Sequence, residues 1–573
     1  MAEILPLNYR LRLVPDLSRF TFDGHVDIRL RLAEPAAELV LNAAELAVWS
    51  CGVRRGDELL PCSFRVVPAA EELHVAFPEA LAGEVQLSID YAGRINDRMA
   101  GFYRSRYLHK GRRRYIAITQ FEESDARRAF PCMDHPRRKA TFDIEMEVAR
   151  CLAAVANTDI KAQELLKGGK KRVIFETTPA MSTYLVFFGV GDFETLQDPI
   201  DGRVRVLTLP PSQKYGRFGL EFGRKALAFS ESYYGVPYPL SKMDLIAVPD
   251  FAFGAMENWG AITFRENLLL HHPGITSRSG EERICEVIAH EIAHQWFGNL
   301  VTPSDWKYLW LNESFATYFG YGVVAHFYPG WGIWQQFLHG TTATALQRDA
   351  LLENVAIEIP GGEHLVINTS TAPIIYNKGG SILRQVEGYI GSAYFQKGLR
   401  HYLHAGIQNL APGHNQAGFA AAKQRREKLR EMLVDLVEGF LQPVPRFSID
   451  PSNRIFQRID GFRQVCVLRI EMPLALRRCL QLFQRRQIDR TEGRNGIGQT
   501  GHLALQILRL HVRLIQRHQR RFIRLGIDQL LREAVAVETR SLFLQLQLDD
   551  AFAQRLQAAL GFETRLLALA HLL

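Results

Sequence analysis

The stretch "EERICEVIAHEIAHQWFG" (Glu281–Gly298) places apolar residues at helical spacing around two histidines that stand four residues apart. Residues at positions i and i+4 of a helix point from the same face, so His290 and His294 lie about one turn apart. That arrangement suits two ligands of one zinc ion, although ordinary core or surface histidines give the same pattern. The apolar residues on both sides of the pair predict that this helix is buried within a mixed α/β domain.

Two acidic residues complete a candidate metal site. Glu291 lies on an adjacent part of the helix face, where its carboxylate reaches a metal-bound water without binding the metal itself. Glu313, in "WLNESFATYFGYG", follows His294 by nineteen residues, which is enough chain for a loop and a return on a second helix. The alternative for Glu313 is an exposed acid at a helix start. Two histidines and one glutamate leave one coordination position open, as in catalytic zinc sites.

A further carboxylate stands in an apolar run. "FAFGAMENWGAITF" (Phe251–Phe264) resembles a buried strand apart from Glu257. Burying a carboxylate costs several kcal/mol unless a cation or hydrogen-bond donors meet it. The sequence therefore predicts a partner for Glu257, supplied either by the chain or by a ligand.

The chain divides into three regions. Residues 1–198 are short alternating segments between Gly, Pro, Asp and Asn turns, which predict a β-rich sandwich or saddle domain. Residues 199–440 combine helical periods with short strand-like segments, which predict a mixed α/β domain. Residues 441–573 are a Leu, Arg and Gln mixture with intermittent helical spacing, which predicts a divergent, mostly helical tail. The predicted fold class is a mixed α and β multidomain protein.

Charge and cysteine usage narrow the function classes. The net charge of +8 comes from residues 429–573, which hold 22 Arg, no Lys and 14 acidic residues. Few aromatic residues accompany these charges, so no nucleic-acid partner is predicted. The seven cysteines are scattered and odd in number, which argues against a disulfide framework and a cysteine metal site. With no basic leader and no long apolar run, we expect a cytoplasmic protein without a membrane partner.

Several separated segments carry a specific family resemblance. In chain order they are "GHVDIRL", "INDRMAGFYRS", "TQFEESDARRAFPCMD", "GAMENWG", "HEIAHQWFGNLVT" with "WLNESFATY", and "IIYNKGG". Together they resemble a zinc metallo-aminopeptidase of the aminopeptidase N family (gluzincin, peptidase M1), in the style of its puromycin-sensitive and alanyl members. The resemblance covers about residues 5–403 and implies a thermolysin-like catalytic domain.

The resemblance also implies catalytic roles. His290, His294 and Glu313 would bind one zinc ion per chain, and Glu291 would be the general base that activates the zinc-bound water. Tyr376, which by itself is one tyrosine among eighteen and fits an ordinary buried ring, would stabilise the oxyanion.

The same resemblance implies a substrate-binding set. Glu257 and Glu122 would bind the free α-ammonium of a peptide, so that the ligand supplies the missing cation. The other expected members are Gln120 at the first-residue pocket, the backbone at Gly254 and Ala255, and the motif residues Met256 and Asn258. For the small residues at 254 and 255 a tight bend is the alternative.

This sequence departs from the family pattern in places. Ser314, Phe264 and His135 stand where the family commonly has glycine, tyrosine and an acid. After about Gly406 the expected continuation, which includes a helical domain over the active-site cleft, is not recognisable. We hypothesise that the tail at 441–573 arose from a frameshift. A divergent helical domain and a basic nucleic-acid-binding arm are the alternatives.

These observations predict a zinc-dependent aminopeptidase that hydrolyses the N-terminal peptide bond of peptides with a free N-terminus. Two alternatives stay open. A zinc endopeptidase would have the same metal site, and an inactive peptide-binding protein would result if the tail prevents a competent fold.

Overall fold

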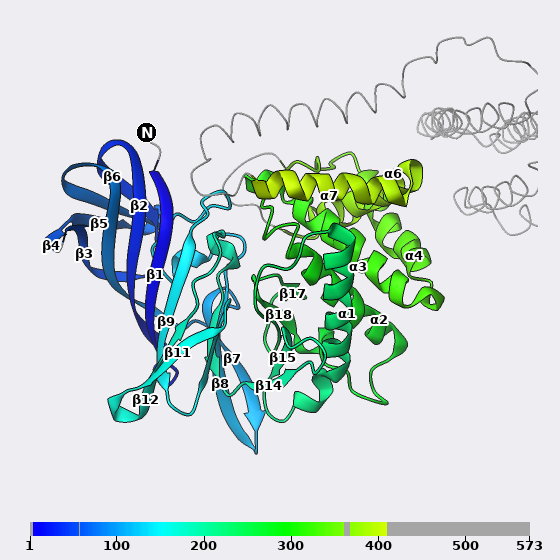
Figure 1. Cartoon of the computed structure of the whole chain (residues 1–573), viewed down its shortest axis with the longest axis horizontal. Helices are drawn as coiled ribbons and strands as arrows, with labels where there is room; N and C mark the ends of the chain where they lie inside the picture. The colour runs from blue at the N-terminus through cyan, green and yellow to red at the C-terminus, as the bar shows by residue number, and fades with distance from the viewer. Residues whose placement is uncertain (1–3, 57, 360–366, 409–573) are drawn as a thin grey trace, which may run out of the picture. The chain divides into compact units, whose positions relative to one another are not determined.

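The computed structural model describes residues 4–56, 58–359 and 367–408. The N-terminal part is built from two sheets, drawn in blue and cyan in Figure 1. The larger sheet has the order β11-β12-β9-β1-β2-β6-β3-β4, with β5 also paired to β6, and the smaller has the order β10-β13-β8-β7. The strands are β1 (Ile4–Asp16), β2 (Thr21–Asn42), β3 (Ala47–Arg55), β4 (Glu58–Pro61), β5 (Ser63–Val67), β6 (Glu72–Arg94), β7 (Gly101–His109), β8 (Arg112–Gln120), β9 (Thr141–Ala149), β10 (Ala153–Ala156), β11 (Ile160–Leu165), β12 (Lys170–Phe175) and β13 (Phe188–Gly191).

Buried apolar residues alternate with more exposed residues along the strands, and the buried ones form the core of this part. Tyr9, Leu11 and Leu13 of β1 are buried, and the residues between them face outward or are half-buried. β1 runs parallel to β9, and Tyr9 stands opposite Phe142, with their rings stacked at a centroid distance of 5.1 Å. Aromatic contacts of this kind bury large apolar areas, which is why the alternating segments fold as sheets with one dry face.

The second part combines a five-stranded sheet with helices, drawn in green to yellow-green in Figure 1. β16 is buried along its whole length and pairs in parallel with β15 and β18, while β17 forms the antiparallel edge. The strands are β14 (Glu194–Gln197), β15 (Val204–Thr208), β16 (Met243–Val248), β17 (Ala255–Met256) and β18 (Ala261–Arg265). The helices are α1 (Arg217–Tyr234), α2 (Arg278–His294), α3 (Trp310–Phe327), α4 (Ile333–Gln336), α5 (Ala343–Asp349), α6 (Gly379–Ile390) and α7 (Ser392–Gln408), with the π-helical segments η9 (Phe337–Thr342) and η10 (Pro373–Lys378).

The predicted fold class is confirmed where the structure describes the chain: a β-rich N-terminal domain precedes a helical catalytic domain in a mixed α/β protein. The proposed boundary between residues 198 and 199 stays a prediction. β14 already pairs with β15 in the five-stranded sheet, so that sheet begins a few residues before this boundary. The predicted tail at 441–573, with the frameshift hypothesis, lies outside the described residues.

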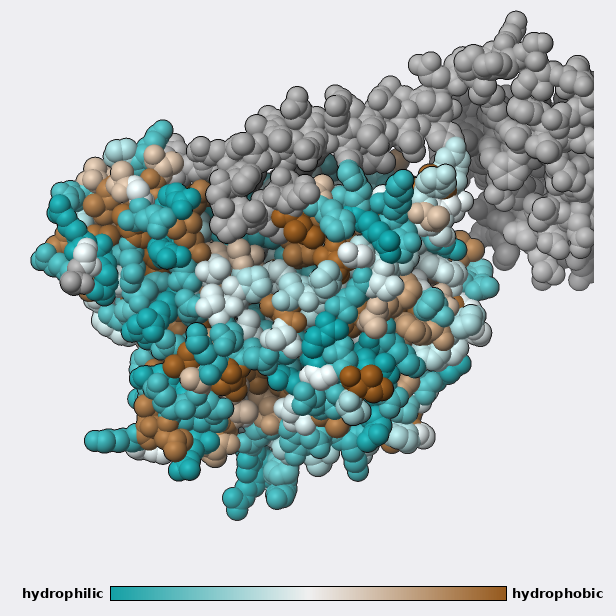
Figure 2. Space-filling view, viewed as in Figure 1, coloured by the Kyte–Doolittle hydropathy of each residue, from teal (hydrophilic) through white to brown (hydrophobic). Residues whose placement is uncertain are grey.

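The face of the molecule drawn in Figure 2 carries many hydrophilic residues, with hydrophobic residues in separate patches between them. Within the part of the chain that the structure describes, no helix combines the length and the apolarity that a membrane crossing needs.

Candidate metal centre and substrate site

Two helices bring the three predicted metal ligands together. α2 carries His290 and His294, and the first turn of α3 carries Glu313. The Nε2 atoms of the two histidines lie 3.2 and 3.3 Å from Glu313 Oε2, and 3.1 Å from each other. His294 and Glu313 are buried, and only 13% of the His290 side chain is exposed.

The donor atoms of this cluster fit a zinc ion. His294 Nδ1 lies 3.0 Å from the carbonyl oxygen of Phe297, so with a metal bound the ring proton would stay on Nδ1 and the lone pair of Nε2 would face the cluster. That lone pair would face a carboxylate oxygen of Glu313, and two such electron-rich atoms repel each other. A cation bound between them would turn the repulsion into attraction. Four ligands around zinc at about 2.0–2.1 Å stand roughly 3.3–3.4 Å apart, close to the separations in this cluster.

Glycines let the two helices approach. A Cβ atom at Gly320 of α3 would lie 3.1 Å from the carbonyl oxygen of Glu286 and 3.4 Å from the Cβ of His290 on α2. Gly298, at a φ of +132°, turns the chain directly after α2, in a conformation that other residues rarely adopt. The motif glycines therefore serve close packing behind the ligands.

Three carboxylates lie beside the metal cluster. Ligand atoms of Glu257, Glu291 and His294 all lie within 4.8 Å of one another. Glu257 and Glu291 are 3% and 5% exposed, and Glu257 Oε1 and Glu291 Oε2 are buried without a hydrogen-bond partner. Glu122, which follows the end of β8 by two residues in the N-terminal domain, also has a buried, unpartnered Oε1. Buried carboxylate oxygens without partners indicate that this site is built to receive a cation.

Burial and neighbouring charges shift the pKa values of the acidic residues in the site. Burial raises the pKa of Glu291 well above its ordinary value, His294 opposes the shift, and the charge of Glu257 adds to it. Burial and the charges of Glu257 and Glu313 likewise raise the pKa of Glu122. Burial also acts on Glu313, but the two histidines outweigh it and hold its pKa well below the usual range. Perturbed pKa values are common at functional sites.

Tyr376 reaches the same cluster from η10. Its ring stacks on that of His290 with centroids 6.0 Å apart and an interplanar angle of 14°. Burial raises the pKa of its hydroxyl well above the ordinary value, and the charges of Glu313 and Glu122 add to the shift. The hydroxyl therefore keeps its proton at neutral pH and is a hydrogen-bond donor beside the metal cluster.

The other predicted substrate residues differ in their surroundings. Gln120 is 1% exposed, and neither its amide oxygen nor its amide nitrogen has a partner. Ala255 and Met256 form the edge strand β17, and Gly254 precedes them. Asn258 makes a local hydrogen bond, in which its Nδ2 donates to Thr263 Oγ1 at 3.2 Å. Its Oδ1 stays unpartnered.

The structure adds two residues that the sequence reasoning passed over. Asn299 Nδ2 donates to the main-chain carbonyl of Glu257 at 2.8 Å, and Gln295 Nε2 donates to the same oxygen at 3.3 Å. Both side chains are fully buried just after α2. They fix the loop that bears Glu257 against the helix that bears Glu291. Their sequence signal was two amides inside the otherwise apolar run "QWFGNLV".

Residues of the N-terminal domain also hydrogen-bond to the loop that follows α2 and carries Asn299. Tyr184 donates its hydroxyl proton to the carbonyl of Gly298 at 3.3 Å. Lys139 Nζ donates to the carbonyls of Asn299 and Leu300 at 3.2 and 3.3 Å. Burial lowers the pKa of Lys139 to about 7. Residues far away in the sequence thus support the loop that carries Asn299.

Lys139 gives a testable pH dependence of stability. Its folded-state pKa of about 7 lies below the unfolded value of about 10.4, so the unfolded chain holds more protons between these values. The free energy of unfolding should therefore rise with pH in this window, by up to about 1.4 kcal/mol per pH unit, relative to Lys139→Met. Urea unfolding of both proteins between pH 7 and 9 measures the difference. The exposed Lys307, replaced by Met, is the control, and parallel curves for wild type and Lys139→Met would contradict the expectation.

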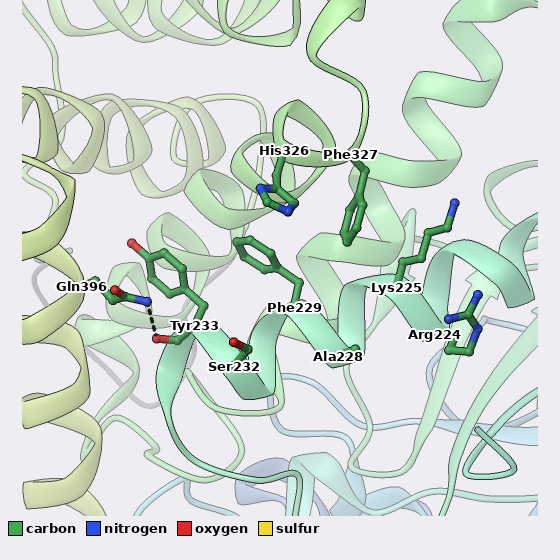
Figure 3. Close-up of a pocket in the computed structure, with 9 residues that line it drawn as sticks. All are labelled: Arg224, Lys225, Ala228, Phe229, Ser232, Tyr233, His326, Phe327 and Gln396. Atoms are coloured by element: carbon green, nitrogen blue, oxygen red, sulfur yellow. Dashed lines mark hydrogen bonds between the residues drawn. The ribbon is translucent and has the colours of Figure 1, made fainter. Parts of the chain in front are cut away.

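The surface depression in Figure 3 is separate from this cluster. It is lined by side chains of α1, the end of α3, and Gln396 of α7, whose Nε2 donates to the carbonyl of Tyr233 at 3.0 Å. None of the residues predicted for the active site lines it. Glu122, Glu257 and Glu291, with their buried, unpartnered carboxylate oxygens, therefore lie outside this depression.

Family models match two parts of the chain. The model of the peptidase M1 N-terminal domain matches residues 5–185, and that of the peptidase family M1 domain matches residues 218–428. The chain belongs to peptidase family M1. The predicted family resemblance is confirmed, and the M1 match extends past residue 403, where the recognisable motifs end.

Curated relatives of this M1 chain are aminopeptidases by name. Aminopeptidase M1-B of Oryza sativa subsp. japonica is 43% identical over 401 residues, which is 70% of this chain and 46% of that protein. Aminopeptidase 2, mitochondrial, of Saccharomyces cerevisiae is 40% identical over 412 residues (70% and 42%). The puromycin-sensitive aminopeptidase of Caenorhabditis elegans is 38% identical over 405 residues (70% and 43%). This M1 chain thus spans somewhat less than half the length of these relatives.

Proposed function

We propose that this chain is a zinc-dependent aminopeptidase that removes the N-terminal residue of peptides. The observation that carries the proposal is the meeting of a two-histidine, one-glutamate cluster with buried, unpartnered carboxylates. Membership of the M1 family, a family of zinc metallopeptidases, supports the hydrolytic chemistry. In this proposal His290, His294 and Glu313 hold the ion.

Each residue of the cluster has a role in amide hydrolysis. When bound, zinc supplies Lewis-acid activation of the attacking water and the scissile carbonyl. Glu291, whose Oε2 is buried without a hydrogen-bond partner beside His294, takes the proton of that water. Tyr376, which keeps its hydroxyl proton, donates a hydrogen bond to the oxygen that becomes negative.

The carboxylates would decide which bond is cleaved. Glu257 and Glu122 hold the substrate's α-ammonium beside the metal cluster, so only the first peptide bond reaches Glu291. β17 is the edge of its sheet, and its outer backbone groups are suited to pairing with an extended peptide. Gln295 and Asn299 keep the ammonium site and the base at a fixed separation.

Glu257→Gln tests the ammonium-binding role. Losing one partner of a buried charge pair costs about 2 kcal/mol or more, so kcat/KM for an aminoacyl-anilide should fall about 30-fold or more. The matched control is Glu266→Gln, a part-buried glutamate nine positions further on, whose pKa burial also raises. It should leave kcat/KM unchanged.

The activity itself is tested on the full chain. Aminoacyl-anilides should be hydrolysed, a chelator should abolish the reaction, and N-terminally acetylated peptides should resist cleavage. Cleavage of acetylated peptides at internal bonds would identify an endopeptidase instead. A chain that binds zinc and peptides without cleaving them would be a binding protein.

A further inference from the structure

The proposed reaction requires two segments that are far apart in the sequence, α3 and η10, to stay at a fixed distance from each other. Glu313 lies in the first turn of α3, and Tyr376 lies in η10. A group that stabilises a developing oxyanion works only when its donor stands about 2.7–3.1 Å from that oxygen. The position of η10 relative to α3 therefore matters for rate, and some contact has to fix it.

The residue next to Glu313 makes such a contact. Ser314 Oγ donates to the main-chain carbonyl of Ile375 at 2.7 Å, and Ser314 is fully buried. Ser314 directly follows the proposed ligand Glu313, and Ile375 directly precedes Tyr376. One buried hydrogen bond thus joins the residue that follows Glu313 to the residue that precedes Tyr376.

The glycines of "YNKGG" make room for this contact. A Cβ atom at Gly379 would lie 1.8 Å from Ser314 Oγ and 2.6 Å from Ser314 Cβ. A Cβ atom at Gly380 would lie 3.2 Å from Thr317 Cγ2, one turn further along α3. The start of α6 therefore packs directly against the face of α3 that carries Ser314, and a larger residue at 379 would push the two apart.

We propose that Ser314 is a positioning residue, whose hydroxyl holds the tyrosine-bearing segment η10 against the ligand-bearing helix α3. This role rests on the proposed aminopeptidase function. Ser314 touches neither substrate nor metal and acts through the placement of the Tyr376 hydroxyl.

Ser314→Ala is the direct test, because it removes the hydroxyl and leaves the Cβ atom in place. We expect kcat for an aminoacyl-anilide to fall about tenfold, while KM changes less than about twofold and zinc content stays at one per chain. Ser314→Gly, which also fits the space, should give the same result if the alanine variant folds poorly. The control is Ser88→Ala, because Ser88 is also buried and its Oγ donates to Asp27 Oδ1 at 2.5 Å, between β6 and β2 of the N-terminal sheet. That control should retain the wild-type kcat.

A double-mutant cycle separates positioning from general stabilisation. Once Tyr376→Phe has removed the hydroxyl that Ser314 positions, adding Ser314→Ala should lower kcat less than about twofold further. An equal loss of kcat in both backgrounds, or no loss in the wild-type background, would overturn the positioning role. A wild-type chain without peptidase activity would overturn the proposed function and this inference together.

Discussion

Glu291→Gln is expected to lower kcat for an aminoacyl-anilide by about 10²- to 10⁴-fold while the chain keeps its zinc. Glutamine has nearly the same shape, so it fits the buried space where Glu291 Oε2 now lies without a partner. It cannot accept the proton of the attacking water, and no other proposed group is placed to do so. The measurement is steady-state kinetics together with elemental analysis of zinc.

The matched control for this variant lies on the same helix. Glu282, more than two turns before Glu291, interacts with Arg278 and Gln336 away from the metal cluster. Glu282→Gln should therefore retain wild-type kcat and zinc content. Full activity of Glu291→Gln would refute the proposed mechanism, whatever its zinc content.

His294→Ala is expected to remove zinc binding and, with it, all peptidase activity. His294 is the most buried of the three ligands, and the Phe297 carbonyl holds its Nδ1, so its Nε2 is fixed toward the cluster and alanine removes that ligand atom. Losing a residue that only hydrogen-bonds to a zinc ligand weakens binding about 10- to 100-fold, so losing the ligand should cost more than about 100-fold. Zinc titration with a competing chelator measures the change.

His326→Ala is the control for this second prediction. His326 is an exposed residue in the last turn of α3, packed beside Phe229 and Phe327 away from the metal cluster. Zinc affinity should be unchanged in that variant. If His294→Ala bound zinc as tightly as wild type, the metal would have to lie elsewhere, and the assignment of His290 and Glu313 would fail with it.

Much of the candidate site could be predicted because its signals are local. The spacing of His290 and His294 is a property of one helix, and α2 forms where the apolar period predicts it. Glu257 stood out as one acid in an apolar run, and it is indeed buried. It lies just after β17, in the turn before β18. The sequence alone predicted one continuous strand where the structure has these two strands and a turn.

The supporting contacts could not be predicted, because each joins residues far apart in the chain. Nothing in the sequence near Lys139 indicates that its ammonium meets the carbonyl of Asn299. The amide of Asn299 likewise gives no hint of the Glu257 carbonyl. Ser314 was visible only as a departure from the family pattern, and its partner Ile375 lies 61 residues away.

The sequence by itself determined which residue types the proposed site contains, namely two histidines four residues apart and several acids in apolar surroundings, and the β-rich and α/β texture of the two described parts. These follow from residue identity and short-range periodicity, which do not depend on the rest of the fold. The tertiary structure alone decided how those groups are held, through the Asn299 and Gln295 bonds to Glu257, the Ser314 bond to η10, and the support from Tyr184 and Lys139. Such contacts depend on how helices, sheets and loops pack over long separations, and close packing lets a donor and acceptor meet only once every intervening element is in place.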